Sequence, residues 1–364
     1  MKTSNPSGHR KSGRSWKKIT LRAIVSLVGV VLLLLAAGFI YESITSRHAQ
    51  ATHPPPGKMI DINGYRLHVH TYGTGSPTIL LEAGSGETSL SWRQIPEQLA
   101  ASTGATVVTY DRAGYAWSDT SPLPRTGQNI VKELHTALQK ANIPGPYLLA
   151  GHSLGGMYSR LFAQTYPDEI AGMVLIDARP ENDAERTEAI YKEEHAGSST
   201  PSPYISIFLD EVGAFRLFPN FMLTGRVEPE DRQDFVNVVA SPKYFKAVSE
   251  EGKLASTTED AIRNQKLGNL PVRIIARGQE QDLTRFGISE EANNKIEQSW
   301  QIGQREMLAI SNNSKLIVAK RSEHMIIHDQ PKLVIRVIEE LLAEIRQKSS
   351  DNGKSAAGSG AGSS

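Results

Sequence analysis

Tyr147-Leu148-Leu149-Ala150-Gly151-His152-Ser153-Leu154-Gly155-Gly156 is the stretch that decides the fold: an apolar run passes through Gly151–Gly155 into a helix-compatible segment. A strand that turns into a helix within a few residues holds its central residue in a strained backbone conformation, and the neighbours two positions away must be small. The glycines at 151 and 155 meet this requirement. The pattern therefore predicts a nucleophile elbow that holds the Ser153 hydroxyl above the carboxyl end of the strand.

The backbone amide of Leu154 would be the first of the predicted helix. An amide at a helix N-terminus points toward the space where negative charge develops during attack on a carbonyl group, and it stabilises that charge. In this interpretation, Ser153 is a nucleophile and Leu154 supplies half of an oxyanion hole. A Gly/Ser-rich tight turn without chemistry is the alternative, but the strand before the turn and the helix after it favour catalysis.

Length, charge and composition favour an enzyme over a small binding module. The chain has 364 residues, enough for a large core, and its formal net charge of +1 gives no general attraction to nucleic acid. The chain has no cysteine, so its sequence excludes disulfides, thiol catalysis and cysteine-based zinc sites. It contains no dinucleotide or phosphate motif, and we expect no cofactor and no nucleic-acid partner.

The N-terminal region has the composition of a membrane anchor. Residues 1–22 form a basic tail with seven Lys and Arg and no acid, and residues 23–41 are uncharged and rich in Val and Leu. An apolar helix of this length can cross the hydrocarbon core of a bilayer. The preceding cations predict a cytoplasmic N-terminus and a catalytic domain on the non-cytoplasmic side. Secretion after signal cleavage is the alternative, although this run exceeds the ~7–15 apolar residues of a usual signal peptide.

Two biased segments set the limits of the folded domain. Residues 42–58 include Pro54-Pro55-Pro56 and are expected to form a stiff Pro-rich linker. Residues 349–364 are rich in Gly, Ser and Ala and are expected to be disordered. The catalytic domain is therefore expected over residues 59–348.

Strand-like and helix-like patterns alternate between these limits. Apolar, β-branched runs predict strands at 66–72, 78–81, 106–110, 147–150, 173–176, 272–276 and 315–319. Helical patterns occur at 92–101, 129–141, 154–166, 288–311 and 332–347. This alternation predicts a mostly parallel sheet with helices on both faces. Residues 179–270 break the alternation and are interpreted as an inserted helical lid.

Five motifs occur in a fixed order along the chain. They are Leu81-Glu82-Ala83-Gly84-Ser85-Gly86, Tyr110–Ser118, Gly151–Gly155, Val174-Leu175-Ile176-Asp177, and Ser322-Glu323-His324 followed by Asp329-Gln330-Pro331. In these motifs the chain resembles the α/β-hydrolase fold superfamily, from about residue 59 to residue 345. The resemblance implies an α/β fold with a mostly parallel, doubly wound sheet and a helical lid. It also implies a triad in the chain order serine, acid, histidine, with the histidine in the loop after the last strand.

The resemblance assigns the base to His324, between the strand predicted at 315–319 and the helix that begins at Pro331. An imidazole in hydrogen-bond reach of a seryl hydroxyl can take its proton during attack. His328 is the competing residue, and His324 is preferred because its distance from Pro331 matches the family pattern. No metal site is expected at these two histidines, because the segment is a loop and suggests no third ligand.

Two aspartates are candidates for the acid of the triad. In most of the family the acid follows the strand after the lid, which nominates Asp282. In other members the acid ends the strand after the nucleophile strand, which nominates Asp177. Strand ends on this edge of the sheet face the site, and Asp177 lies directly at such an end. We prefer Asp177 and keep Asp282 as the alternative.

The resemblance also suggests roles around the triad. Ser85 is the candidate for the second oxyanion amide, although Gly84-Ser85-Gly86 stands where the family usually has His-Gly. Trp92 and Trp117 are candidates for lining the substrate pocket, with ordinary core packing as the alternative. Asp111 and Arg112 are interpreted as an ion pair that braces the wall of the site, because buried charges need partners.

A serine nucleophile at position 153 implies acyl transfer through an acyl-enzyme. The epoxide hydrolases and haloalkane dehalogenases of this fold use a carboxylate at that position. The aromatic lid and the membrane anchor point to a carboxylesterase or lipase-like enzyme whose partners are a small ester with an apolar acyl group and the lipid bilayer. The alternatives are an aminopeptidase or C–C bond hydrolase of the same fold, and a catalytically silent binding protein.

Overall fold

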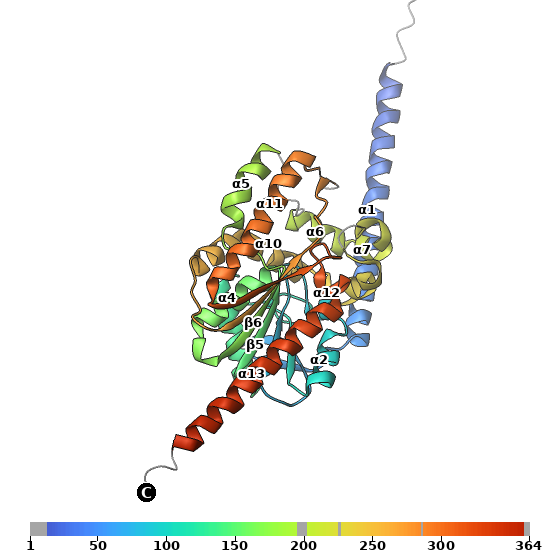
Figure 1. Ribbon diagram of the computed structural model, residues 1–364. Coiled ribbons are helices and arrows are strands. Elements are labelled where there is room, and N and C mark those ends of the chain that lie inside the picture. The colour runs from blue at the N-terminus through green and yellow to red at the C-terminus, as the bar shows by residue number, and fades with distance from the viewer. Residues whose placement is uncertain (1–12, 195–201, 225–226, 285–286, 360–364) are drawn as a thin grey trace, which may run out of the picture. The chain divides into compact units, whose positions relative to one another are not determined.

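The computed structural model describes residues 13–194, 202–224, 227–284 and 287–359. The chain divides into two compact units (Figure 1). The helical unit combines Met1–His53 with Tyr204–Asn237, and the sheet unit combines Pro54–Pro203 with Val238–Ser364. A segment from the middle of the sequence therefore belongs to the same unit as the N-terminal helix.

The sheet unit is built on an eight-stranded sheet, counted over the described residues, with the strand order β1-β2-β4-β3-β5-β6-β7-β8. The pairs β1–β2 and β2–β4 are antiparallel and the other neighbours are parallel, which confirms the mostly parallel sheet. Seven strands match the predicted ones within a few residues. The strand β1 was missed because it is only four residues long and half-buried. The strands are β1 (Lys58–Asp61), β2 (Arg66–Tyr72), β3 (Thr78–Glu82), β4 (Val107–Tyr110), β5 (Tyr147–His152), β6 (Ile170–Ile176), β7 (Pro271–Arg277) and β8 (Asn313–Ala319).

Helices cover both faces of this sheet, as the alternating sequence pattern predicts. Successive side chains of a strand point to opposite faces. In β5, Leu149 joins the core under α3 and α4, whereas Leu148 joins the core under α2 and α13. The helices of this unit are α2 (Ile95–Thr103), α3 (Gly127–Lys140), α4 (Leu154–Thr165), α5 (Asp183–Glu193), α10 (Pro242–Ile262), α11 (Glu290–Glu306), α12 (Ile326–Asp329) and α13 (Pro331–Ser359), with short 3₁₀ turns η1 (Ser89–Trp92), η2 (Pro167–Glu169) and η6 (Met307–Ile310).

The helix α1 (Gly13–Thr52) extends beyond the predicted span of 23–41. Eleven of the residues assigned to the linker at 42–58 are therefore helical, because Glu42–Thr52 contains neither Gly nor Pro and the helix continues until the prolines from Pro54 onward. At the other end, α13 continues to Ser359, inside the segment 349–364 that was expected to be disordered. Residues 1–12 of the basic tail and residues 360–364 lie outside the described residues.

Helices, and no strand, lie between β6 and β7 in the described part of residues 179–270. Part of this stretch, Tyr204–Asn237, groups with α1 rather than with the sheet. Residues 195–201 and 225–226 lie outside the described residues. The helices of this part are α6 (Pro203–Glu211), α7 (Ala214–Leu217), α8 (Pro219–Met222) and α9 (Arg232–Asp234), with the 3₁₀ turn η3 (Pro229–Asp231) and the π-helical turn η4 (Phe235–Val239).

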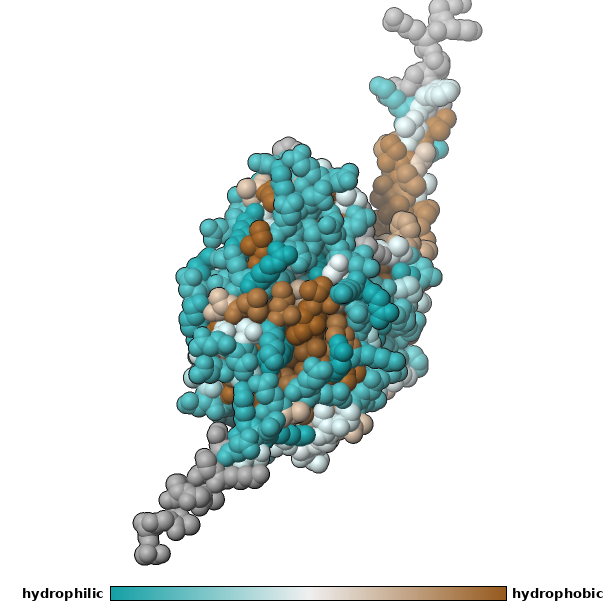
Figure 2. Space-filling model, in the orientation of Figure 1, coloured by the Kyte–Doolittle hydropathy of each residue, from teal (hydrophilic) through white to brown (hydrophobic). Residues whose placement is uncertain are grey.

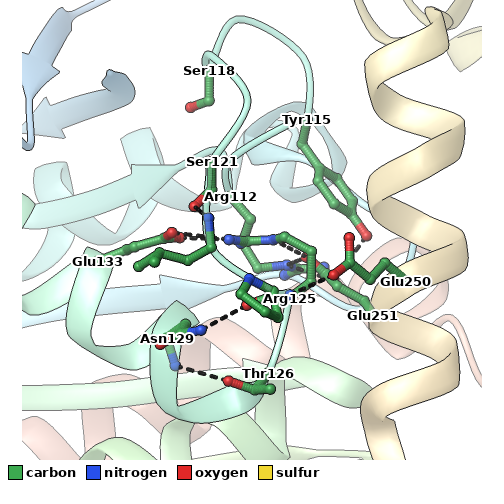
Figure 3. A network of polar contacts seen from close by, with 12 residues as sticks. Arg112, Tyr115, Ser118, Ser121, Arg125, Thr126, Asn129, Glu133, Glu250 and Glu251 are labelled. Atoms are coloured by element: carbon green, nitrogen blue, oxygen red, sulfur yellow. Dashed lines mark hydrogen bonds and ion pairs between the residues drawn. The ribbon is translucent and has the colours of Figure 1, made fainter. Parts of the chain in front are cut away.

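A buried charge network joins α10 to the loop after β4 (Figure 3). Glu251 on α10 accepts hydrogen bonds from Arg112 Nε at 3.1 Å and from the Tyr115 hydroxyl at 2.8 Å. Arg112 also donates to Glu82 at 3.0 Å, and Arg125 donates to Glu133 at 2.7 Å. The carboxylate of Glu251 is fully buried. Because each buried charge has partners of opposite sign, removal of one member leaves the others uncompensated.

Replacement of Glu251 by glutamine should lower the free energy of unfolding by about 3–5 kcal/mol, the usual effect of breaking a buried ion pair. The matched control is Glu188→Gln, whose partner Lys192 is 74% exposed, and this change should cost at most about 0.5 kcal/mol. Denaturant titration of the detergent-solubilised full chain measures both values. Equal effects of the two substitutions would show that the network does not stabilise the fold.

Candidate active site

The turn from β5 into α4 has the strained geometry of the predicted elbow. Ser153 has φ 52° and ψ −122°, a backbone conformation that costs energy for a residue with a side chain. A Cβ at Gly151 would lie 2.5 Å from the Gly155 carbonyl oxygen, and a Cβ at Gly155 would lie 2.3 Å from the carbonyl oxygen of Glu82 on β3. No larger residue fits at either position. The glycines therefore permit a turn that Ser153 could not otherwise occupy.

The structure brings Ser153, His324 and Asp177 into one hydrogen-bonded chain. His324 Nε2 lies 2.9 Å from Ser153 Oγ, and His324 Nδ1 lies 2.6 Å from Asp177 Oδ2. Ser153 follows β5, Asp177 follows β6, and His324 lies in the loop between β8 and α12. The Asp177 side chain is fully buried, whereas the His324 side chain is 21% exposed. The chain thus runs from a buried carboxylate to a hydroxyl within reach of solvent.

Three residues fix the orientation and the charge of Asp177. Its Oδ1 accepts hydrogen bonds from Trp300 Nε1 at 3.0 Å and from the Arg277 backbone amide at 3.1 Å, and Arg277 Nη1 donates to Oδ2 at 3.0 Å. Burial alone would raise the pKa of Asp177, but the hydrogen bond from His324, the positive charges and the Trp300 indole hold this pKa at about 2. The carboxylate is therefore ionised and acts as an acceptor toward His324.

The two alternative residues have other partners. His328 Nε2 lies 2.9 Å from the Ser91 carbonyl oxygen. Asp282 is exposed, and its Oδ1 accepts the Thr284 backbone amide at 2.9 Å in a local turn. The structure thus assembles the preferred serine, histidine and aspartate, while His328 and Asp282 make their contacts elsewhere.

The loop after β3 forms a tight turn beside the elbow. The Glu87 amide donates to the Gly84 carbonyl oxygen at 3.3 Å, and Gly86 has φ 74°, which favours glycine. Ser85 lies at the exposed corner of this turn. Leu154 is the first residue of α4. The backbone amides of Ser85 and Leu154 are the two that the sequence nominates for an oxyanion hole.

Side chains from two other elements hold this loop. Arg112 donates to the carbonyl oxygens of Ala83 at 2.7 Å and Gly84 at 2.6 Å. The Tyr244 hydroxyl, on α10, donates to the Gly86 carbonyl oxygen at 2.9 Å. The loop is therefore fixed through its carbonyl groups.

Two expectations for residues around the site need correction. Asp111 does not pair with Arg112: its Oδ2 accepts from His68 Nδ1 at 2.8 Å, because the two side chains of the dipeptide point to different elements. Trp92 is fully buried in the core under α2 and α13, so core packing, the alternative interpretation, describes it. Trp117 packs on His68 with ring centroids 4.8 Å apart.

Sequence reasoning missed a second pair of charged groups behind the site. His152 Nδ1 lies 2.9 Å from Glu87, and His152 Nε2 lies 3.0 Å from the backbone carbonyl oxygen of His324. Glu87 also accepts the Gly84 amide at 2.7 Å. One buried imidazole thus links the loop after β3 to the loop that carries His324. The only sequence signal for this role is the position of His152 directly before Ser153.

The charges of this pair support each other. Burial alone would lower the pKa of His152, but the carboxylate of Glu87 and the His324 carbonyl group raise it above the usual value of 6.5. Burial alone would raise the pKa of Glu87, but the positive charge and hydrogen bond of His152 hold it at about 2. His152 in its protonated form donates from both ring nitrogens, as the two contacts require.

Trp300 and Arg277 were also missed as parts of the site. Trp300 stands edge-on to the His324 ring with centroids 5.5 Å apart, and the Arg277 guanidinium lies 4.7 Å from the centre of the Trp300 ring. Arg277 ends β7, and this position at the carboxyl edge was the available signal. Trp300 lies within a long helix, where nothing in the sequence separates it from a packing residue.

Comparison with known proteins agrees with the fold. Residues 77–201 match the family model described as alpha/beta hydrolase fold. The Bacillus subtilis protein YqjL is 28% identical over 278 residues, which cover 76% of this chain and 88% of that protein. A thermophilic esterase from Thermogutta terrifontis superposes with a TM-score of 0.54 at 20% identity, over 79% of this chain and 97% of that one. A laboratory evolved variant of potato epoxide hydrolase gives 0.57 at 17% identity, over 79% and 98%.

The sheet unit has the α/β-hydrolase fold, and residues 77–201 carry the likeness to that family. The esterase and the epoxide hydrolase share its fold.

Substitution of Glu87 by glutamine should remove a pH-dependent part of the stability. The folded pKa of His152 is raised, so its stabilisation is complete below pH 6.5 and is lost as pH rises through the folded value. The folded pKa of Glu87 is lowered to about 2, so its stabilisation is complete above pH 4.5 and is lost as pH falls toward 2. The decrease in thermal midpoint caused by Glu87→Gln should therefore be largest between pH 4.5 and pH 6.5, and smaller at lower and at higher pH.

Thermal unfolding of the detergent-solubilised full chain at a series of pH values measures this difference. The control is Glu340→Gln on the exposed surface of α13, whose side chain is 69% exposed. A Glu87→Gln effect that is the same at every pH would contradict a charged His152–Glu87 pair.

Proposed function

We propose that this protein is a serine hydrolase that cleaves an ester with an apolar acyl group through an acyl-enzyme. The observation that carries the proposal is the continuous chain from Asp177 through His324 to Ser153, with contacts of 2.6 and 2.9 Å. A hydroxyl becomes a useful nucleophile only when a base within hydrogen-bond reach takes its proton. In this proposal His324 is that base.

The reaction begins when Ser153 Oγ attacks the ester carbonyl carbon and His324 Nε2 takes the hydroxyl proton. The carbonyl oxygen becomes an oxyanion, which the backbone amides of Leu154 and Ser85 stabilise. The tetrahedral intermediate collapses when the carbon–oxygen bond to the alcohol breaks and His324 gives its proton to the departing oxygen. Water then attacks the acyl carbon with His324 as base. The bond to Ser153 Oγ breaks, His324 returns the proton to Oγ, and the carboxylic acid product is released.

Asp177 keeps His324 in the tautomer that this sequence requires. An ionised carboxylate at Nδ1 accepts a proton from that nitrogen, so Nε2 faces Ser153 as an acceptor. The pKa of Asp177, held at about 2, keeps the carboxylate charged when His324 becomes an imidazolium. Trp300 and Arg277 hold the carboxylate in place and are positioning residues in this account.

A serine at position 153 favours ester hydrolysis over epoxide opening. Epoxide hydrolases of this fold use a carboxylate where this chain has Ser153. The carboxylate forms an alkyl ester with the substrate, and water then hydrolyses this ester at the carbonyl carbon of the enzyme's side chain. A seryl hydroxyl has no carbonyl carbon and cannot form such an intermediate. The membrane anchor proposed below would keep the enzyme close to lipid esters, which fits an apolar acyl group.

We propose further that α1 anchors the protein in a bilayer. Among the described residues, one helix, Trp16–Thr52, is long and apolar enough to cross a membrane. Figure 2 shows hydrophobic residues along much of this helix, and Leu33 and Leu34 are 72% and 67% exposed. The seven cations of residues 1–22 favour a cytoplasmic N-terminus, so the sheet unit would lie on the non-cytoplasmic side.

Substitution of Ser153 by alanine should abolish turnover of short p-nitrophenyl esters without loss of the fold. His324→Ala should lower kcat to nearly the same level, because the nucleophile and its base act as one unit and their losses do not add. The matched control is His328→Ala, four residues away, which should keep most of the activity. Steady-state kinetics together with circular dichroism measure both properties. An inactive His328→Ala beside an active His324→Ala would show that the base is misassigned.

Substitution of Asp177 by asparagine should lower kcat by ~10⁴-fold with little change in KM, because the imidazole loses the partner that fixes its tautomer. The matched substitution Asp282→Asn should have little effect, since Asp282 bonds within its own turn. Kinetics on the same esters compare the two variants. A large loss at Asp282 with a small loss at Asp177 would reverse the assignment of the acid.

In sealed vesicles, protease added on the non-cytoplasmic side should digest the sheet unit, while protease on the cytoplasmic side should reach only residues 1–22. Immunoblotting with a tag at each end of the chain distinguishes the two digests. Recovery of a soluble form that begins near Thr52 would indicate a cleaved signal instead of an anchor.

A further inference from the structure

The segment 204–237 packs on α1 at the end of its apolar stretch. A Cβ at Gly38 would lie 2.6 Å from the Val212 carbonyl oxygen, so the backbone after α6 touches the helix backbone and only glycine fits. The next residue, Gly213, has φ 72° and lies against the ring of Tyr41. Both contacts fall within the last four residues of the uncharged stretch 23–41.

An ion pair fixes the segment at the first charge after that stretch. Arg216 on α7 donates two hydrogen bonds to Glu42, each of 3.0 Å, and both side chains are only 13% exposed. The same guanidinium donates to Asn237 and to the Val236 carbonyl oxygen, each at 2.7 Å. A paired, bidentate arginine holds geometry better than a single contact. The segment is thus attached to α1 through backbone contact and through charge.

Large apolar side chains of the segment remain exposed. Six of them are between 45% and 84% exposed, and they occur within eighteen residues of sequence, from 204 to 221. Monomeric soluble proteins rarely expose so many aromatic and branched side chains together, and such surfaces mark interaction sites. The six are Tyr204, Ile205, Phe208, Leu217, Phe218 and Phe221.

We infer that the described residues 204–224 and 227–237 form a membrane-docked cap, in which these exposed side chains insert into the interfacial layer of the bilayer that α1 crosses. The inference rests on the proposed membrane anchor. The cap joins α1 between Gly38 and Glu42, where the apolar stretch ends and the first charge appears, and this transition marks the membrane boundary. Aromatic side chains at that depth are favoured because their rings suit the boundary between headgroups and acyl chains.

Charge favours lipid insertion over attraction to an anionic partner. Residues 204–237 contain six acidic and three basic side chains, a formal net charge of −3. Anionic lipids and nucleic acids would be repelled by this charge. The cap is therefore expected to bind neutral phosphatidylcholine, and its attachment should resist high salt, because insertion of apolar area does not depend on screening.

Single-cysteine labelling tests the inference, since the chain has no cysteine of its own. The full chain with Phe221→Cys, labelled with bimane, is placed in phosphatidylcholine vesicles that contain lipids with a nitroxide quencher near the headgroup. Leu33→Cys, in the apolar stretch, tests the anchor with a quencher deep in the acyl chain. The matched control is Ile302→Cys on α11, an apolar residue of the sheet unit that is 48% exposed.

The expected result is a loss of bimane emission at position 221 with the shallow quencher, at low and high salt, and no loss at position 302. Quenching at position 33 but not at 221 would overturn the docked cap and leave the anchor intact. Quenching at neither position would show that α1 does not insert. A label at 221 that is shielded without quenching, in proportion to protein concentration, would show that a second copy covers the cap and would also overturn the inference.

A pair of glycines separates attachment from insertion. Gly38→Val would place a side chain against Val212 and should reduce quenching at position 221, while quenching at position 33 persists. Gly29→Val is the matched control, because a Cβ there meets nothing within 4 Å. Equal quenching at 221 in the two variants would contradict a cap held at the membrane by its contact with α1.

Discussion

The strained turn at Ser153 is the constraint on which the rest of the site depends. A residue with a side chain has φ 52° between a strand and a helix, and this conformation persists only because the surroundings allow no other. The Gly155 backbone lies against Glu82 on β3, and a Cβ at Gly156 would lie 2.3 Å from Ala178 after β6. The elbow is therefore in close contact with both neighbouring strand ends, one leading to the loop that contains Ser85 and the other carrying Asp177.

Buried charged side chains hold the loops around the site in place. Arg112 holds the carbonyl groups of the loop after β3 and pairs with Glu251 on α10 (Figure 3). His152 ties the same loop to the backbone of His324. Each arrangement places a cation against carbonyl oxygens or carboxylates inside the protein, where electrostatic interactions are strong and an unpaired group is costly. The two arrangements therefore hold the loops beside Ser153 in place through buried ion pairs and hydrogen bonds.

The predictable parts of this protein are those encoded in short sequence windows. The elbow was predictable because glycines two positions on either side of Ser153 are required by local crowding. The strands were predictable because a parallel sheet buried on both faces needs continuous apolar runs such as Leu148–Ala150. The choice of Asp177 over Asp282 could be made only narrowly, since both follow strands.

The parts that could not be predicted are contacts between distant segments. Glu87 and His152 meet from positions 65 residues apart, and Arg216 meets Glu42 across 174 residues. A single sequence does not reveal such pairs, because each charged residue could equally be exposed to solvent or paired with a different residue. The ion pair expected within Asp111-Arg112 was wrong for the same reason: adjacent residues of an extended loop face different neighbours, and each found its partner on another element.

The central claim is that the hydrogen-bonded chain makes Ser153 nucleophilic. The most direct measurement is mass spectrometry of the full chain after reaction with a fluorophosphonate probe, followed by peptide mapping of the adduct. The account predicts one phosphonyl group per chain, on Ser153, and slow labelling when His324 is replaced by alanine. A chain that stays unlabelled, or an adduct on another serine such as Ser159, would contradict it.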